Sequence, residues 1–271
     1  MNASRFTPPS AASPTLDEPA MAVTRIEENH WQATQGDTVV GGADVSRRPD
    51  GRLFLSVDAW HAAVFDRLAA TAAADLGGPV HTVVDETDDE LVAAWQRAGF
   101  TVGRREGEYV LPTDPAVTGL DPDLLPPGIE ILPAGQAQEG PLRALDRVVR
   151  DEISATVGWH VMPAEVVPLP DGVTVLDPTR YAVATRAGEY LGFVRVAPVP
   201  RRPRIGLVAV RADQRGQGLG RALLAHALGA LHRAGSASAW AEVHEANPAA
   251  LALVERAGAR RAGGNLELVR P

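Results

Sequence analysis

The sequence lacks both cysteine and lysine, so all 26 basic residues among its 271 positions are arginines. These absences exclude a lysine Schiff base, a Walker-type phosphate loop ending in Gly-Lys-Ser/Thr, a cysteine nucleophile, a disulfide framework and a thiolate metal site. Any anion-binding site in this protein must therefore be built from arginine side chains and backbone amides.

Long apolar runs are missing as well. No stretch approaches the roughly 20 apolar residues of a membrane span. The first 20 residues hold four prolines and no apolar run, so they lack the core of a secretory signal. We expect residues 1–21 to form a flexible leader, and the protein to be soluble and cytoplasmic. The net charge of −8 argues against sequence-independent nucleic-acid binding, which depends on a basic face.

A proline-rich segment divides the chain. Residues 112–133 contain six prolines, and proline fixes φ and removes an amide donor, so neither a helix nor a central strand is expected there. The length of the chain also allows two compact units. We predict a domain at residues 22–113, a linker at residues 114–127 and a second domain at residues 128–271.

Hydrophobic periodicity predicts the order β-α-α-β-β-β-α-β-α-β for the second domain. The expected fold class is α/β (α+β), with a twisted mixed sheet flanked by helices in each domain. The predicted strands are Ile129–Leu132, Tyr181–Thr185, Tyr190–Ala197, Ile205–Val210, Ala239–Val243 and Leu266–Val269, and three of the four predicted helices are centred on Leu142–Val149, Ala222–Leu231 and Pro248–Ala257.

The first domain repeats the later part of that order. Its helix end at Gln96–Phe100 resembles the one at Glu255–Ala259, and each is followed about ten residues later by a β segment. We interpret this as an internal repeat, with chance recurrence of Arg-Ala-Gly in an alanine-rich chain as the alternative. The predicted elements are strands at Gln32–Thr34, Val39–Val45, Leu53–Val57, Val80–Val84 and Tyr109–Leu111, and helices at Ala59–Ala74 and Asp88–Ala98.

The two copies differ in kind at one turn. After the central strand the first copy reads DAWHA, whereas the second reads RADQRGQGLGR. Glycines at positions 216, 218 and 220 let successive N–H groups point into one concavity, and a helix that begins there adds unpaired amides and the positive end of its dipole. Such a turn suits a pyrophosphate. The first copy is predicted to lack this loop.

Two motifs carry a resemblance to a known family. Arg215–Gly220 fits R/Q-x-x-G-x-G/A after a strand, and Asn247–Leu253 fits N-x-x-A-x-x-L on a later helix. In this order and spacing they resemble the GNAT (GCN5-related N-acetyltransferase) superfamily. A dinucleotide-binding fingerprint fits poorly, because the third glycine comes one residue early. The chain therefore resembles a tandem GNAT protein with a degenerate N-terminal copy and one intact cofactor site.

The resemblance implies acetyl-CoA or another acyl-CoA as donor, with no metal. It implies a pantetheine arm paired with the backbone of the central strand like an added strand, and a pyrophosphate on the loop amides. The cofactor-binding residues implied are Val208, Ala209, Val210, Arg215, Gly216, Gln217, Gly218, Leu219, Gly220, Arg221 and Asn247. One departure from the family stands out: Val254 occupies the position where many members carry the tyrosine that protonates the departing thiolate.

A base is needed because amine acetylation requires a neutral nitrogen. Glu242, on the strand AWAEVHE, is the candidate, and strand alternation puts His244 on the same face. The alternative is a solvated carboxylate at a strand end. The resemblance assigns acceptor selection to the segment that holds Trp159, His160 and Glu152, although Trp159 also suits a core position.

Two further clusters of histidine and charged residues allow more than one interpretation. His30, His61 and His81 with the acids of residues 85–90 invite a metal site, but these histidines lie on different predicted elements and the acids suit a helix N-terminus. The arginines of residues 201–204 suit either the 3′-phosphate of CoA or a solvated hairpin end.

The sequence thus predicts an N-acetyltransferase that transfers acetyl from acetyl-CoA directly to an amine of a small molecule or peptide. No nucleic-acid or membrane partner is expected. A non-catalytic acyl-CoA-binding or partner-docking protein is the alternative, because of Val254 and the degenerate first copy.

Overall fold

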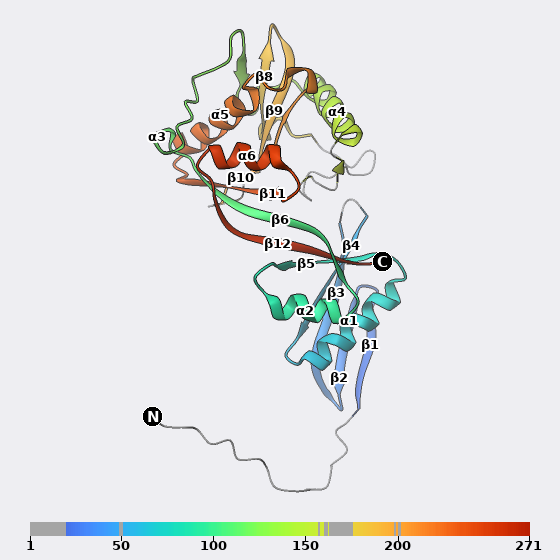
Figure 1. The fold of residues 1–271 in the computed structure, drawn as a ribbon. Coiled ribbons are helices and arrows are strands. Elements are labelled where there is room, and N and C mark those ends of the chain that lie inside the picture. Colours follow the sequence, from blue (N-terminus) through green and yellow to red (C-terminus); the bar gives the residue numbers. More distant parts are fainter. Residues whose placement is uncertain are drawn as a thin grey trace, which may run out of the picture. The chain divides into compact units, whose positions relative to one another are not determined.

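The computed structural model describes residues 20–48, 51–156, 158–159, 162, 176–197, 199 and 202–271. The expected leader and His160 therefore fall outside the described residues, except for the last positions of the leader. No helix of the described residues is long and apolar enough to cross a membrane. Figure 1 shows the elements, which are β1 (Met21–Glu27), β2 (His30–Gln35), β3 (Thr38–Arg47), β4 (Leu53–Ala59), α1 (Ala62–Leu76), β5 (Val80–Asp85), α2 (Asp89–Arg97), β6 (Thr101–Pro112), α3 (Pro115–Thr118), β7 (Glu130–Leu132), α4 (Glu139–Ala155), β8 (Tyr181–Arg186), β9 (Glu189–Ala197), β10 (Arg204–Val210), α5 (Leu219–Arg233), β11 (Ser238–His244), α6 (Pro248–Arg256) and β12 (Arg260–Arg270), with two short 3-10 turns at Pro178–Arg180 and Ala212–Gln214.

The chain divides into two compact units, which are described separately. The first comprises Met1–Val45 and Leu55–Gly77, and the second comprises Ser46–Phe54 and Gly78–Pro271. In the first unit, β1, β2 and β3 pair antiparallel in sequence order. Trp31 of β2 is fully buried, and its indole N–H donates to Asp75 of α1 at 2.8 Å. The apolar stripe of α1 repeats at three- and four-residue intervals and forms the buried face of the helix.

The second unit is built on a mixed sheet with the strand order β5-β12-β6-β11-β10-β9-β8-β7. Alternate residues of β8 and β9 enter two different cores: Val183 and Phe193 pack with α4, while Ala184 and Val194 pack with α5. Because successive strand side chains point to opposite faces, α4 covers one face of the sheet and α5 the other (Figure 1). This layered mixed sheet agrees with the expected α/β (α+β) class.

Strand β6 joins the sheet of the second unit, which differs from the expected division at residue 113. It pairs antiparallel with β11 on one side and with β12 on the other. Strand β12 in turn pairs with β5. The last strand of each predicted copy thus lies beside the penultimate strand of the other. Contrary to the expected absence of a helix, the proline-rich segment contains α3 (Pro115–Thr118), whose proline occupies the first helical turn, where no amide donor is needed. Backbone pairing, and not this segment, decides which sheet a strand joins.

The helices and caps of the two halves correspond closely. Helices α1 and α5 each have 15 residues, and α2 and α6 each have nine. Asp88 caps α2 by accepting from the amide of Leu91, and Asn247 caps α6 by accepting from that of Ala250. Strand β4 pairs parallel with β5, as β10 does with β11. Each half thus has a 15-residue helix, a nine-residue helix with a side-chain cap and one parallel pair of strands.

Candidate active site

A cleft opens where the parallel strands β10 and β11 diverge. They pair through Arg204 and Trp240 alone, and beyond that point a cleft of about 300 Å³ lies between them. Its walls come from both strands, from α4 and from the start of α6. The lining residues are Val149, Ile153, Thr156, Met162, Ile205, Gly206, Leu207, Val208, Ala209, Val210, Arg215, Gly220, Ala241, Glu242, Val243, Asn247, Ala249, Ala250, Leu253 and Val254.

One edge of β10 is left open toward the cleft. Val208, Ala209 and Val210 pair with β9 on their other side, while their pairing with β11 has already ended. A β-bulge between Ile205 and Leu207 changes the register of β10 just before this segment. The main-chain groups of this edge can therefore pair with an extended ligand as an added strand would.

The glycine-rich loop at the end of the cleft leads into α5. Gly216 and Gly218 have φ of 77° and 84°, a left-handed conformation that glycine adopts without strain. Within the described part of the chain, none of the backbone N–H groups of residues 217–221 donates to a main-chain carbonyl. Five consecutive amides at the start of a 15-residue helix are an arrangement that can bind an anion. The structure thus brings the predicted loop, β10 and Asn247 around one cleft.

The loop arginines are held by the protein itself. Arg215 donates through Nε to the carbonyl of Val210 at 3.1 Å and through Nη2 to Glu152 at 3.1 Å. The carboxylate oxygens of Glu152 also accept from the amide of Ala212, at 3.0 and 2.9 Å. Arg221 donates to the carbonyl of Gly119 at 3.3 Å. Glu152 is predicted to contact the acceptor. The structure instead places it between α4 and the turn before the loop, and these bonds join the two.

Replacing Glu152 with glutamine is expected to loosen this turn. The variant loses one ion pair and the charge on the acceptor of the Ala212 amide, which is worth about 1 kcal/mol at this partly exposed position. We expect a decrease of that size in the free energy of unfolding, measured by urea denaturation, and a several-fold weaker affinity for acetyl-CoA, measured by calorimetry.

The matched control is Glu139→Gln at the other end of the same helix. Glu139 forms an exposed i,i+4 pair with Arg143 at 2.5 Å and lies away from the loop. The Glu139→Gln variant should change the affinity for acetyl-CoA by less than about twofold. If Glu139→Gln weakens acetyl-CoA binding as much as Glu152→Gln does, Glu152 has no special role in holding the turn before the loop.

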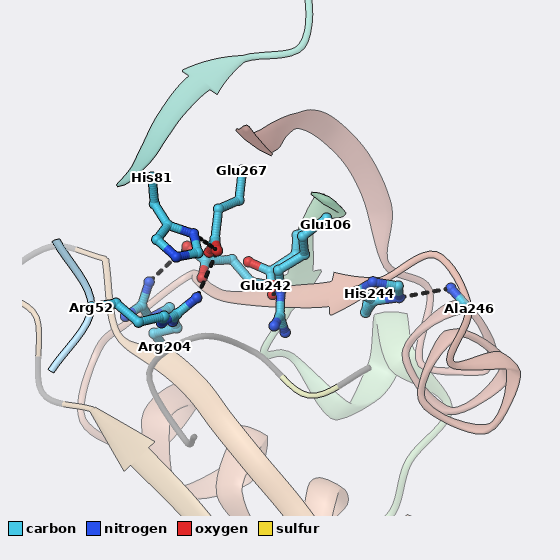
Figure 2. A network of polar contacts seen from close by, with 9 residues as sticks. Arg52, His81, Glu106, Arg204, Glu242, His244, Ala246 and Glu267 are labelled. Carbon is cyan, nitrogen blue, oxygen red and sulfur yellow. Dashed lines mark hydrogen bonds and ion pairs between the residues drawn. The ribbon is translucent and has the colours of Figure 1, made fainter. Parts of the chain in front are cut away.

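The predicted base, Glu242, lines the cleft from β11. Its side chain is 20% exposed, and it accepts from Arg204 Nη1 at 2.7 Å, so the solvated alternative does not hold. His244 lies on the same face, as expected from alternation, and its Nδ1 accepts from the amide of Ala246 at 3.0 Å (Figure 2). This hydrogen bond fixes the tautomer that carries the proton on Nε2 when the ring is neutral.

The expected acceptor segment is described at a few positions only. Trp159 donates to the hydroxyl of Ser154 at 2.8 Å, and the guanidinium of Arg150 lies 5.4 Å from its ring centroid. Met162 is buried in the core beneath α4 and also lines the cleft. Trp159 therefore packs beside the core rather than lining the cleft, and His160 lies outside the described residues.

The tyrosine expected from the family resemblance is missing from the cleft. Val254 is 6% exposed and lines it. The three tyrosines of the chain all lie in described regions, and none lines the cleft. Burial raises the pKa of the Tyr181 phenol, which belongs to the core beneath α4. The cleft therefore offers no phenol at the position where the resemblance places a proton donor.

Of the three histidines considered for a metal site, two bond separate carboxylates, whereas His61 is the N-cap residue of α1 and makes no side-chain cap. His30 bonds Asp44 at 2.6 Å. Figure 2 shows the carboxylate of Glu267 between His81, at 2.9 Å, and Arg52, at 2.6 Å. Among the described residues no group of three or more His, Cys, Asp or Glu side chains is placed to hold a metal ion.

The fold is that of the GCN5-related N-acetyltransferases. A member from Sphaerobacter thermophilus aligns over 92% of this chain and 83% of its own, with a TM-score of 0.63 and 17% identity. A tandem GNAT protein from the clavulanic acid biosynthesis pathway aligns over 93% of this chain and 83% of its own, with a TM-score of 0.58 and 16% identity. At these identities the likeness defines the fold alone.

The sequence comparisons specify the class further. Residues 152–259 match the Acetyltransferase (GNAT) family, a range that includes the glycine-rich loop and α6. The [ribosomal protein bS18]-alanine N-acetyltransferase of Escherichia coli K12 is 39% identical over 74 residues, which are 27% of this chain and 50% of that protein. The chain thus spans about half the length of the curated relatives it matches. Its C-terminal part is thus similar to GNAT-type acetyltransferases, and these matches support an acyltransferase.

Proposed function

We propose that the protein is an acyl-CoA-dependent N-acetyltransferase that transfers acetyl directly from acetyl-CoA to an amine of a small molecule or peptide. The observation that carries this proposal is the row of free backbone amides at residues 217–221 at the end of a cleft between two diverging parallel strands. Direct transfer agrees with the absence of cysteine, which leaves no thiol for a covalent acyl-enzyme.

The described residues fit acetyl-CoA. The open edge of β10 at Val208–Val210 offers main-chain groups to the pantetheine arm, and the loop amides offer donors to the pyrophosphate. Asn247 uses its side-chain oxygen to cap α6, which leaves its amide N–H₂ on the wall of the cleft as a donor. Acetyl-CoA supplies the activated acetyl group when bound.

Glu242 is suited to remove the proton from the attacking amine. Arg204 Nη1 donates to the carboxylate of Glu242 at 2.7 Å and fixes its orientation. Glu242 accepts one proton from the ammonium form of the acceptor, and the neutral amine then forms the new C–N bond while a main-chain N–H at the open edge of β10 can donate to the oxyanion. The C–S bond then breaks, and the second nitrogen proton passes through water to the thiolate, in place of the tyrosine replaced by Val254.

We further propose that the N-terminal half is a degenerate copy of the same domain. Its helix α1 follows the turn DAWHA, and its N-cap residue, His61, makes no side-chain cap. Neither Trp60, which is 93% exposed, nor its neighbours in this turn is a glycine. The copy thus lacks the positive-φ backbone that forms the anion site after β10.

The test is release of free CoA from acetyl-CoA in the presence of an amine panel that includes amino acids, polyamines and a peptide beginning with alanine. Because the protein has no cysteine, a thiol-reactive dye reports CoA without background from the enzyme. We expect release that depends on the amine. Tight acetyl-CoA binding without turnover on any amine would instead favour the non-catalytic alternative that Val254 suggests.

A further inference from the structure

A second cavity meets the cleft at Glu242. It has a volume of about 220 Å³ and lies on β6, β10 and β11 of the second unit. Ala241 and Glu242 line both spaces, so a molecule in the second cavity can reach the proposed base. The lining residues are Glu108, Val199, Arg202, Arg204, Trp240, Ala241 and Glu242.

Two carboxylates, those of Glu108 and Glu242, line the cavity. Among the described residues, only Glu242 of these two forms an ion pair. Glu108 and Glu242 are cross-strand partners on β6 and β11, with Cβ atoms about 5 Å apart in such pairs, and like charges in this position are destabilising. Arg204 bonds Glu242 at 2.7 Å. Among the described residues, Glu108 accepts only a long hydrogen bond of 3.5 Å from Asn265 and has no ion-pair partner. Its half-buried carboxylate is therefore available to a cation in the cavity.

A guanidinium lines the same cavity. Arg202 lies over the ring of Trp240, 3.6 Å from its centroid, which fixes the plane of the guanidinium. No carboxylate of the described residues forms an ion pair with Arg202. A planar guanidinium held in this way can bind a carboxylate or phosphate through two hydrogen bonds.

We propose that this cavity is the acceptor site and that it takes a small amine bearing an anionic group, with the chemistry of an α-amino acid. The inference rests on the proposed function. The amine is held by Glu108 beside Glu242, where the cleft supplies the acetyl group, and the anionic group binds Arg202. The volume of about 220 Å³ suits a molecule smaller than the ligands of typical drug-sized pockets.

The test compares amino acids with their amides in the CoA-release assay and, independently of turnover, by calorimetry on the protein saturated with CoA. We expect kcat/KM and affinity at least about tenfold higher for the free acids, since a hydrogen-bonded charge pair has this size of effect. Arg202→Gln should remove that preference and leave the amides unchanged. Glu108→Gln should raise the KM of acids and amides alike by about tenfold, without changing the KM of acetyl-CoA.

Two exposed residues of the same chain provide charge-matched controls. Arg256→Gln on α6 and Glu90→Gln on α2 remove the same charges away from both cavities and should leave acceptor kinetics unchanged. Transfer or binding with no preference for the acids, or a preference that survives Arg202→Gln, overturns the acceptor assignment alone. Failure to bind acetyl-CoA at all overturns the proposed function instead.

Discussion

Replacement of Gly218 by aspartate should weaken acetyl-CoA binding by at least about 100-fold. The residue has φ of 84°, which disfavours any side chain, and it caps the start of α5 among the free amides. A carboxylate there meets the pyrophosphate at short range, and two unit charges about 4 Å apart repel by about 4 kcal/mol near a protein surface. Isothermal titration calorimetry with acetyl-CoA measures the loss directly.

The matched control is Gly235→Asp, just beyond the other end of α5. Gly235 has φ of 85°, and an added Cβ would meet no atom within 4 Å, so this variant reproduces the backbone strain without the anion site. Ala59→Asp places the same charge at the last residue of β4, just before the turn, and tests the first copy. Both variants should bind acetyl-CoA as the wild type does. Equal losses in all three variants would refute a single cofactor site in the loop.

Glu242→Gln should lower kcat by about 100-fold at a pH well below the pKa of the acceptor amine, the usual minimum contribution of a positioned base. There most of the acceptor is an ammonium ion, and Glu242 must remove its proton. As the pH rises through the pKa of the amine, the acceptor is already neutral, so the deficit should shrink. Steady-state rates of the wild type and the variant should converge between about pH 6 and 10, a range that includes the pKa of an α-amino group.

Glu245→Gln is the matched control for Glu242. Glu245 follows the same strand, and its side chain is 63% exposed with a long ion pair of 3.5 Å to Arg105. Its removal should leave kcat unchanged at every pH. If the deficit of Glu242→Gln is the same at all pH values, Glu242 orients groups in the cleft but does not accept the amine proton.

The conformation of the glycine-rich loop could be predicted from the sequence because its determinants are local. The spacing of three glycines after an apolar strand specifies positive φ and free amides within seven residues, and the structure places Gly216 and Gly218 accordingly. The cap of α6 at Asn247 followed in the same way from its neighbours. Neither feature depends on a distant part of the chain.

Glu108 could not be found in this way. It becomes a candidate for the site only because β6 pairs with β11, which sets it opposite Glu242. No local pattern in the sequence specifies that register. Glu152 was assigned to the acceptor for a related reason: its place at the end of α4 was clear, but whether its carboxylate faces a ligand or the amide of Ala212 depends on tertiary packing.

The extents of β6 and β12 were underestimated for a physical reason. Both strands carry charged residues at buried positions, so the apolar alternation that marks a strand is interrupted. Arg104 and Glu106 are buried together and bond each other at 2.7 Å. Glu267 is buried between His81 and Arg52. Ion pairing makes these positions tolerable in a sheet, but a single sequence does not show which charges will meet.

The pairing of β12 with both β5 and β6 also determines the order in which the sheet can form. Ribosomes add residues from the N-terminus, so β5 and β6 are synthesised long before β12, the strand that lies between them. Until the final 11-residue strand leaves the exit tunnel, both have unpaired edges open to other chains. Completion of the central sheet must therefore wait for β12, and a chain that lacks this strand leaves β5 and β6 without their common neighbour.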